Sequence, residues 1–135
     1  MRLNRTLCVL AVAALIPATS FAAIEGTKAE DVKGQEICLI DNAYTGVDFR
    51  DAYDRQLRAK GYTTRIIHDK AECPITTTFV ASYSSGAWGR KLKYAMLTIL
   101  RDGEEIAVVR YKPSGGPFKG TVESVIGEMV AVLLP

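Results

Sequence analysis

Residues 91–111 read KLKYAMLTILRDGEEIAVVRY, and this stretch decides the fold class of the chain. Two β-rich runs, 91–101 and 105–111, lie on either side of the pair Asp102-Gly103. Asp-Gly between such runs favours a tight hairpin, because glycine readily adopts the positive φ that the turn requires. The stretch therefore predicts two antiparallel strands and, with them, a fold built on a sheet.

Three more strands are predicted upstream of this hairpin. Residues 36–41 (EICLID) form a short apolar run, which is typical of a strand buried on both faces. Residues 62–68 (YTTRIIH) are β-rich, and residues 75–84 (ITTTFVASYS) place alternate side chains on two sides. We expect the core side of this last strand to carry Ile75, Thr77, Phe79, Ala81 and Tyr83, and the solvated side to carry Thr76, Thr78, Val80, Ser82 and Ser84.

An amphipathic helix is predicted between the first two of these strands, because an apolar residue recurs there every four positions. Gly61 stands where a left-handed cap would end this helix. Thr45, with Asp48 three residues later, suggests a capping box at its start. The apolar stripe consists of Phe49, Tyr53 and Leu57.

A second helix is predicted at the C-terminal end of the sequence. Pro117 suits the first position of a helix. Gly127 lies within this helix, and close packing against the sheet is the expected reason for a glycine there. The core-facing stripe consists of Val122, Val125, Ile126, Met129, Val130 and Leu133.

The predicted element order is β-α-β-β-β-β-α, an α+β two-layer sandwich in which two helices cover one face of a single mixed sheet. The strand, helix and strand at the start favour a parallel pair of strands. We expect residues 35–135 to form one domain. Residues 23–34 (AIEGTKAEDVKG) are polar and without an apolar period, so we expect a flexible N-terminal tether there.

Residues 1–22 have the order of a secretory signal peptide. Arg2 and Arg5 precede an apolar run, and small residues then lead to Ala22, after which we expect cleavage. The apolar run is too short to span a bilayer comfortably, so we expect no stable membrane span after cleavage. The mature product is predicted to be a bacterial periplasmic or secreted protein.

Cleavage after Ala22 would remove Cys8 and leave Cys38 and Cys73. In an oxidising compartment such a pair favours a disulfide. The alternative is a CxxC-type redox centre or a metal site, which would require closer cysteines or several histidines, whereas His68 is the only histidine. We therefore expect a structural disulfide, no metal site and no cofactor. This bond would place the first strand beside the start of the third, in the interior of the sheet.

Core, turn and cysteine positions of this sequence resemble the Sbal-type family of small, uncharacterised proteobacterial envelope lipoproteins. The resemblance runs from about Glu36 to the C-terminus, supports the fold and the disulfide, and carries no catalytic motif. The lipid-bearing cysteine of that family has no counterpart here, and the family's Trp-rich segment followed by an acid is replaced by residues 84–88 (SSGAW). The matching positions are Ile37, Cys38, Leu39, Ile40, Asn42, Phe49, Tyr53, Leu57, Gly61, Cys73, Pro74, Thr78, Ala81, Asp102, Gly103, Ala107, Tyr111, Gly115 and Gly116.

No catalytic set is apparent in the sequence. His68 beside Asp69 could tune an imidazole for acid–base chemistry, but the spacing nominates no nucleophile or metal. Residues 114–116 (SGG), near Lys112 and Lys119, could present backbone N–H groups to an anion, although a glycine pair before a helix is more often only a turn. We therefore predict that the protein is not an enzyme. The dispersed acids, which we expect to solvate exposed faces, are Asp51, Asp54, Glu104 and Glu105.

The segment best suited to contact another molecule is 83–93. Trp88 follows a glycine and lies beside Arg90 and Lys91. Aromatic side chains and arginine dominate binding hot spots. In the alternative interpretation Trp88 covers the open sheet face and the basic residues only solvate an edge strand. The predicted binding residues are Tyr83, Trp88, Arg90, Lys91 and Lys93, and the uncovered sheet face at Thr76, Thr78 and Ser82 would extend this surface.

These features together predict a soluble, non-enzymatic accessory or interaction protein of the cell envelope. Its expected partner is another envelope protein or a cell-wall component. The formal net charge of only +2, with the two signs scattered, argues against a nucleic-acid partner. The alternatives are a binding module for cell-wall glycan or an anionic envelope ligand, and a periplasmic inhibitor protein.

Overall fold

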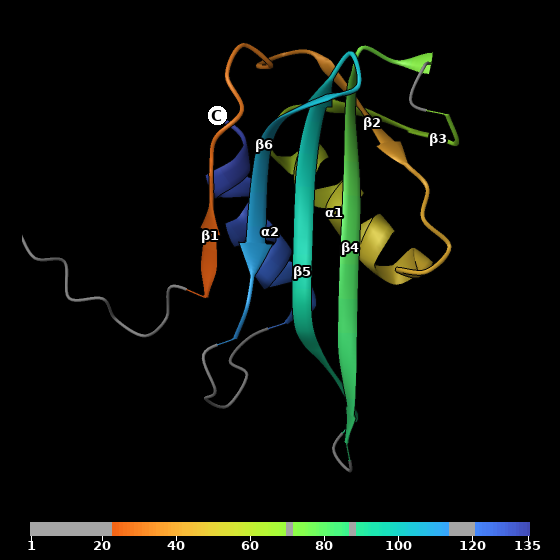
Figure 1. Ribbon diagram of the computed structural model, residues 1–135, viewed down its shortest axis with the longest axis vertical. Helices are drawn as coiled ribbons and strands as arrows, with labels where there is room; N and C mark the ends of the chain where they lie inside the picture. Colours follow the sequence, from red (N-terminus) through yellow and green to blue (C-terminus); the bar gives the residue numbers. More distant parts are fainter. Residues whose placement is uncertain (1–22, 70–71, 87–88, 114–120) are drawn as a thin grey trace, which may run out of the picture.

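The computed structural model in Figure 1 describes residues 23–69, 72–86, 89–113 and 121–135. The expected signal peptide, residues 1–22, lies outside these segments. None of the helices within them has the length and apolarity needed to cross a bilayer. In chain order the elements are β1 (Ile24–Gly26), β2 (Glu36–Ile40), α1 (Val47–Ala59), β3 (Thr63–Ile67), β4 (Ile75–Gly86), β5 (Gly89–Arg101), β6 (Glu104–Tyr111) and α2 (Val122–Leu133).

The strands form one six-stranded mixed sheet in the order β1-β6-β5-β4-β2-β3. β2 runs parallel to both β3 and β4, and the other neighbouring strands are antiparallel. The predicted α+β fold with a single mixed sheet is confirmed, with β1 as an additional strand. β2 lies in the interior of the sheet, as the predicted disulfide required.

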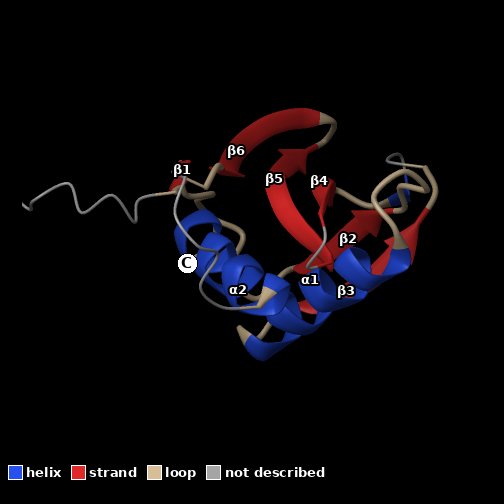
Figure 2. Cartoon of the chain, turned by 90° about the horizontal axis from the view of Figure 1, so that it is seen from below, coloured by secondary structure: helices blue, strands red, loops and turns tan. Residues whose placement is uncertain are grey.

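Figure 2 shows both helices on the same face of the curved sheet. α2 packs on β1, β5 and β6, whereas α1 packs on β3 and against α2. The ring of Phe79 from β4 stacks on Phe49 at 6.2 Å and meets Tyr53 edge-on at 6.0 Å, measured between ring centroids. The apolar stripe predicted for α1 therefore faces the core. The fully buried side chains between the layers include Phe49, Tyr53, Leu57, Phe79, Leu97, Ile99, Ile126 and Met129.

The predicted hairpin between β5 and β6 is present and turns at Asp102 and Gly103. Their φ values are 51° and 84°, and positive φ at both central positions is the requirement of a type I′ turn. The N–H of Asp102 donates to the carbonyl oxygen of Pro74 at 2.9 Å. The turn is therefore tied to the residue that precedes β4.

The N-terminal segment 23–34 is not a free tether, and our prediction there is wrong. Ile24–Gly26 forms β1 on the outer edge of β6, and Ala29 and Val32 are buried. Lys28 Nζ donates to the carbonyl oxygens of Ala131 at 3.1 Å and Leu134 at 3.2 Å. The segment thus covers a sheet edge and places a cation at the C-terminal end of α2, which has no basic residue in its own last turn.

The start of α1 differs from our prediction. Gly46, with φ 86°, is the N-cap of α1, and no side chain caps this helix. The hydroxyl of the buried Thr45 instead donates to the carbonyl oxygen of Phe79 at 3.4 Å, because the preceding loop packs against β4. α2 begins at Val122, where a reciprocal capping box links Thr121 and Ser124, and the predicted start at Pro117 lies outside the described residues. The predicted αL position of Gly61 is confirmed, with φ 101°.

Gly127 and Thr76 also differ from prediction. A Cβ atom on Gly127 would lie 2.9 Å from Gln56 Oε1, so this glycine permits close approach of α1 and not of the sheet. Thr76 is only 1% exposed, although the alternation placed it on the solvated side. It pairs with Cys38 of β2, and a small cluster of Cys38, Ile67 and Cys73 lies on that part of the sheet. Farther along β4, Val80 and Ser82 are exposed as predicted.

The predicted disulfide between Cys38 and Cys73 is present. Their Cα atoms lie 6.3 Å apart, and the two residues are separated by 35 positions in the sequence. The bond joins the centre of β2 to the residue two positions before β4. It therefore covers the neighbouring start of β4 on the face opposite the helices.

Candidate functional site

An open groove of about 540 Å³ lies where the beginnings of α1 and α2 meet the inner side of β4 and β5. Figure 1 shows that these two strands extend beyond the helices at this end of the molecule. Three segments far apart in the sequence therefore contribute to the walls. The groove is lined by Ala43, Tyr44, Thr45, Gly46, Asp48, Phe49, Ala52, Arg55, Tyr83, Arg90, Thr121, Val122 and Glu123.

Arg90 and Tyr83 form the strand wall of this groove. The guanidinium carbon of Arg90 lies 4.5 Å from the centre of the Tyr83 ring, which is a cation–π arrangement. Burial raises the pKa of the Tyr83 hydroxyl, an effect that Arg90 opposes and the carboxylate of Asp48 reinforces. Arg90 forms no ion pair with any residue in the described segments. Its charge is therefore available to an incoming group.

Tyr44 also lines the groove, from the loop between β2 and α1, and is 99% exposed. The loop itself is held in place by Asn42. Asn42 Oδ1 accepts a hydrogen bond from the backbone N–H of Tyr44 at 2.9 Å, and Asn42 Nδ2 donates to the carbonyl oxygen of Phe79 at 3.1 Å. A large exposed ring on an anchored backbone loses little backbone freedom when it binds a partner.

The helix wall carries an ion pair that joins α1 to α2. Arg55 Nε and Nη2 donate to the two carboxylate oxygens of Glu123 at 2.9 and 3.3 Å, and Gln56 Nε2 donates to Oε1 at 3.3 Å. These bonds from Arg55 hold the pKa of Glu123 below its usual range and raise the pKa of Arg55. Glu123 is therefore ionised and already paired, which does not suit a general acid.

Only some residues of the binding segment predicted from the sequence lie in the groove. Tyr83 and Arg90 line the groove, whereas Lys91, one residue farther along β5, points to the other face of the sheet. Lys93 is exposed and does not line the groove. Trp88 lies outside the described residues.

Sequence reasoning missed the residues of the groove that come from the helices and from the loop before α1. Tyr44 and Asp48 belong to that loop and to the first turn of α1, and Arg55 and Glu123 come from two helices. One signal could have found Tyr44. It follows the carboxyl end of a parallel strand, and this is where open α/β sheets tend to bind ligands.

The candidate catalytic residues that the structure describes lie outside the groove. His68 and Asp69 are exposed just beyond the end of β3 and do not line the groove. Lys112 is exposed, while residues 114–116 and Lys119 lie outside the described segments. The acids on α1 are paired along the helix: Asp51 with Arg50 at 3.2 Å, and Asp54 with Arg58 at 3.2 Å. Glu104 and Glu105 are exposed in β6.

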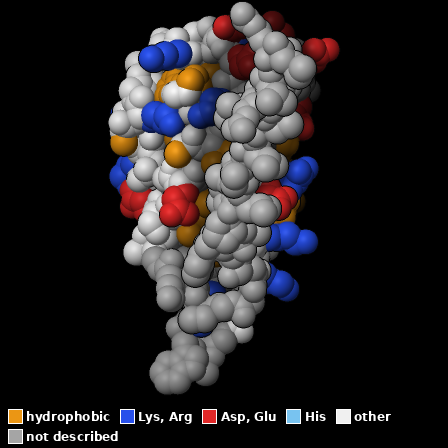
Figure 3. Space-filling view, turned by 90° about the vertical axis from the view of Figure 1, so that its left-hand side faces the viewer, with side chains coloured by type: hydrophobic (Ala, Val, Ile, Leu, Met, Phe, Trp, Pro, Cys, Tyr) orange, Lys and Arg blue, Asp and Glu red, His pale blue; other side chains and the backbone are white. Residues whose placement is uncertain are grey.

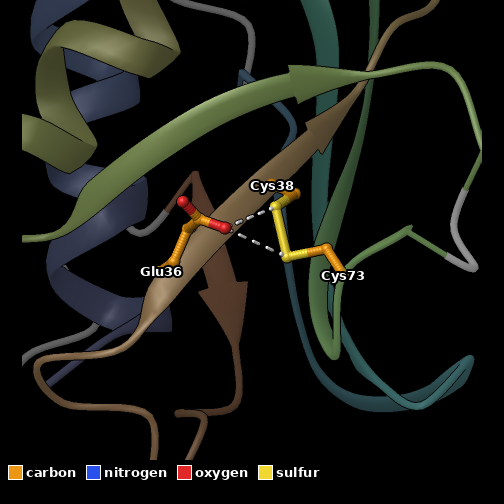
Figure 4. Close-up of side chains that lie close together, drawn as sticks. All are labelled: Glu36, Cys38 and Cys73. Atoms are coloured by element: carbon orange, nitrogen blue, oxygen red, sulfur yellow. Dashed lines mark hydrogen bonds between the residues drawn. A yellow bond between two sulfur atoms is a disulfide. The ribbon is translucent and has the colours of Figure 1, made fainter.

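A second cluster surrounds the disulfide (Figure 4). Glu36 Oε1 lies 3.5 Å from Cys38 Sγ and 3.8 Å from Cys73 Sγ. Arg65 Nη2, from the neighbouring strand β3, approaches the same carboxylate oxygen at 3.3 Å. In the described part of the chain, Glu36, Cys38 and Cys73 form a group whose potential metal-ligand atoms lie within 4.8 Å of one another.

The charges outside these two sites are mixed. On the side of the molecule at β1, Lys and Arg side chains are interspersed with Asp and Glu in Figure 3. The part of that side that is visible carries no continuous stripe of one sign, which is the pattern that a nucleic-acid surface would require.

Comparison with known proteins identifies no family. No family model matches the chain, and no curated protein matches it. The resemblance to the Sbal-type lipoproteins therefore stays a prediction. Among solved structures, a PDZ domain protein from Parabacteroides distasonis matches with a TM-score of 0.48 and 9% sequence identity. The match covers 82% of this chain and 34% of that protein, so this chain spans about a third of its length.

Proposed function

We propose that this chain is an exported, non-enzymatic interaction domain of the bacterial envelope, and that it binds a segment of a partner protein in the groove. The observation that carries the proposal is that two tyrosines and an arginine line the same groove: Arg90 stacked on Tyr83 from the strands, and the exposed Tyr44 from the loop before α1. Tyrosine and arginine are the residue types that most often dominate protein–protein binding energy.

The charges of the groove favour a particular kind of partner segment. Glu123 is neutralised by Arg55, so Arg90 is the cation free to receive an acidic side chain or a chain carboxylate. The rings of Tyr44 and Tyr83 offer apolar contact beside it. A segment with an acidic group next to an aromatic or aliphatic side chain would satisfy both features.

The absence of catalysis is part of the same proposal. The side chains that line the described groove include no serine, cysteine or histidine that could act as nucleophile or base. The signal-like order of residues 1–22 and the disulfide between Cys38 and Cys73 support export to an oxidising compartment.

Site-specific photo-crosslinking in the native host tests the proposal. A photoreactive amino acid replaces Tyr44 in one strain and Val80 in another, because Val80 is 40% exposed on the uncovered sheet face. We expect a discrete protein adduct from position 44 and none from position 80. An adduct only from position 80 would move the contact to the sheet face and overturn the groove.

The same experiment separates the other functions considered for this chain. Cross-links from position 44 to cell-wall glycan, with co-sedimentation of the protein with purified sacculi, would show a glycan-binding module. A secreted hydrolase as the sole adduct, with loss of its activity on binding, would show an inhibitor.

A further inference from the structure

The contacts between Glu36 and the two sulfur atoms are not hydrogen bonds in the oxidised protein. A sulfur atom in a disulfide carries no hydrogen, and an ionised carboxylate accepts hydrogen bonds but cannot donate one. The two dashed contacts of Glu36 Oε1 in Figure 4, at 3.5 and 3.8 Å, therefore become hydrogen bonds only when both cysteines are thiols. The carboxylate is placed for the reduced pair.

Thr76 has an unsatisfied hydroxyl on the same part of the sheet. Its Oγ1 is buried without a hydrogen-bond partner, the only such side-chain atom among the described residues. Thr76 is the β4 residue paired with Cys38 of β2, so both side chains lie on the same face of the sheet. A buried hydroxyl without a partner is costly, and in the disulfide-bonded form neither sulfur accepts a hydrogen bond from it.

We propose that the reduced chain binds one Zn²⁺ through Cys38, Cys73 and Glu36, and that the disulfide is the metal-free, oxidised form of the same site. Two thiolates and one carboxylate are ligands that zinc accepts, and solvent can supply a water as the fourth ligand. The side chain of Glu36 is 46% exposed, which leaves an entry path on that side.

The geometry fits a tetrahedral metal. Two thiolates on one zinc, each about 2.3 Å from the metal, lie roughly 3.8 Å apart. The Cα atoms of Cys38 and Cys73 are 6.3 Å apart, a separation that both a disulfide and a shared metal can span. Cys38 is held in the interior strand β2, whereas Cys73 precedes β4 and lies outside regular structure, so Cys73 can make the adjustment.

Arg65 balances the charge of the site. Zinc with two thiolates and one carboxylate carries a net charge of minus one, and the guanidinium of Arg65 lies 3.3 Å from the carboxylate oxygen of Glu36. Outer partners of this kind orient a ligand and compensate its charge. The conversion of the disulfide form into the zinc-bound form also balances in electrons and protons. A dithiol reductant is oxidised to its own disulfide as it delivers two electrons and two protons to the cysteines, and zinc then displaces those protons into water.

Cobalt binding to the reduced protein tests the proposal. The protein carries Cys8→Ser, so that only the two cysteines of the site remain; it is reduced, and the reductant is removed anaerobically. We expect one equivalent of Co²⁺ to bind, with sulfur-to-metal charge-transfer absorption and the visible bands of tetrahedral cobalt, and Zn²⁺ to displace it. The oxidised protein should show neither signal.

Three carboxylate variants make the test specific. Glu36→Gln should weaken Co²⁺ binding at least about tenfold, the lower end of the cost of losing even an outer partner of a metal ligand. Glu105→Gln changes an exposed carboxylate on β6 and should leave binding unchanged. Glu36→His, which supplies a nitrogen ligand, should restore tight binding. Equal affinity in wild type and Glu36→Gln would overturn the three-ligand site.

A second measurement keeps the test decisive if reduction of the disulfide unfolds the protein. Zn²⁺ is added before reduction, and the thermal midpoint and near-ultraviolet circular dichroism are compared with and without it. We expect Zn²⁺ to preserve the fold of the reduced wild type and to have no effect on a Cys38→Ser, Cys73→Ser variant. A folded reduced protein without cobalt absorption, or an unfolded one in the presence of Zn²⁺, would each refute the proposal.

Discussion

Tyr53 Oη and Thr77 Oγ1 lie 2.6 Å apart in the buried interface between α1 and β4. The hydroxyl of Thr77 donates to the carbonyl oxygen of Thr98 at 2.8 Å, so the hydrogen of this short bond comes from Tyr53. A continuous chain of hydrogen bonds thus runs from the helix through β4 to β5. It explains how a threonine can occupy a core-facing position of a buried strand.

Substitution of Tyr53 by phenylalanine should change the pH dependence of stability. Burial raises the pKa of Tyr53 in the folded protein, so the neutral hydroxyl is favoured there. At pH values below the ordinary tyrosine pKa of 10.0, Tyr53 contributes its full share to the free energy of unfolding. At higher pH this contribution is lost, by up to about 1.4 kcal/mol per pH unit for one proton. The free energy of unfolding, measured by urea titration at chosen pH values between about 8 and 11, should therefore fall less steeply with rising pH for Tyr53→Phe than for wild type. Equal slopes in the two proteins would show that Tyr53 does not cause this loss.

Removal of the disulfide should destabilise the fold substantially. Cys38 and Cys73 are separated by 35 positions, and closing a loop of that size is worth about 4 kcal/mol in the chain-entropy model. A double substitution to alanine should therefore lower the free energy of unfolding by about 2–5 kcal/mol in denaturant titrations. The effect should be absent when the wild type is measured in its reduced, metal-free form against the same variant.

Two glycine-to-alanine substitutions should have opposite effects. At Gly127 the added Cβ meets only the end of the flexible Gln56 side chain, which can move away, so the gain in helix propensity of up to about 1 kcal/mol should dominate. At Gly26 the Cβ would lie 2.4 Å from the backbone oxygen of Val108, which cannot move without disrupting β1. In thermal unfolding, the midpoint temperature of Gly127→Ala should equal or exceed that of wild type, and the midpoint of Gly26→Ala should lie clearly below it.

Lys28 should contribute to stability through the end of α2. Its ammonium donates to the carbonyl oxygens of Ala131 and Leu134, where the helix dipole favours a cation. Lys28→Met keeps much of the aliphatic stem and should cost about 0.3–1 kcal/mol at low salt. Lys33→Met, at an exposed position of the same segment, is the matched control and should be neutral.

Arg90 and its neighbour Lys91 offer a matched pair for the proposed groove. Arg90 stacks on Tyr83 inside the groove, whereas Lys91 points to the opposite face of the same strand. Arg90→Ala should weaken binding of the cross-linked partner about tenfold or more, as expected of a hot-spot residue, and Lys91→Ala should have little effect. Isothermal titration with the identified partner measures both. Equal losses would indicate a general effect of positive charge and not the groove.

Elements governed by short-range rules could be predicted from the sequence. The turn at Asp102 and Gly103 needs only positive φ, and the stripe of Phe49, Tyr53 and Leu57 follows from helical periodicity. The predicted capping box at Thr45 failed for the opposite reason. Its hydroxyl is drawn to Phe79 of β4, a contact that no local pattern contains.

The sequence by itself determined the element order from β2 onward, the α+β class and the cysteine pair, because hydrophobic period and turn chemistry act within a few residues. Only the tertiary structure decided that residues 23–34 carry a strand and that Thr76 is buried. It also decided that Glu36 meets the two sulfurs and that Tyr44 shares a groove with Tyr83. Burial and mutual distance depend on which segments pack together, and this is a property of the whole sheet and its helices.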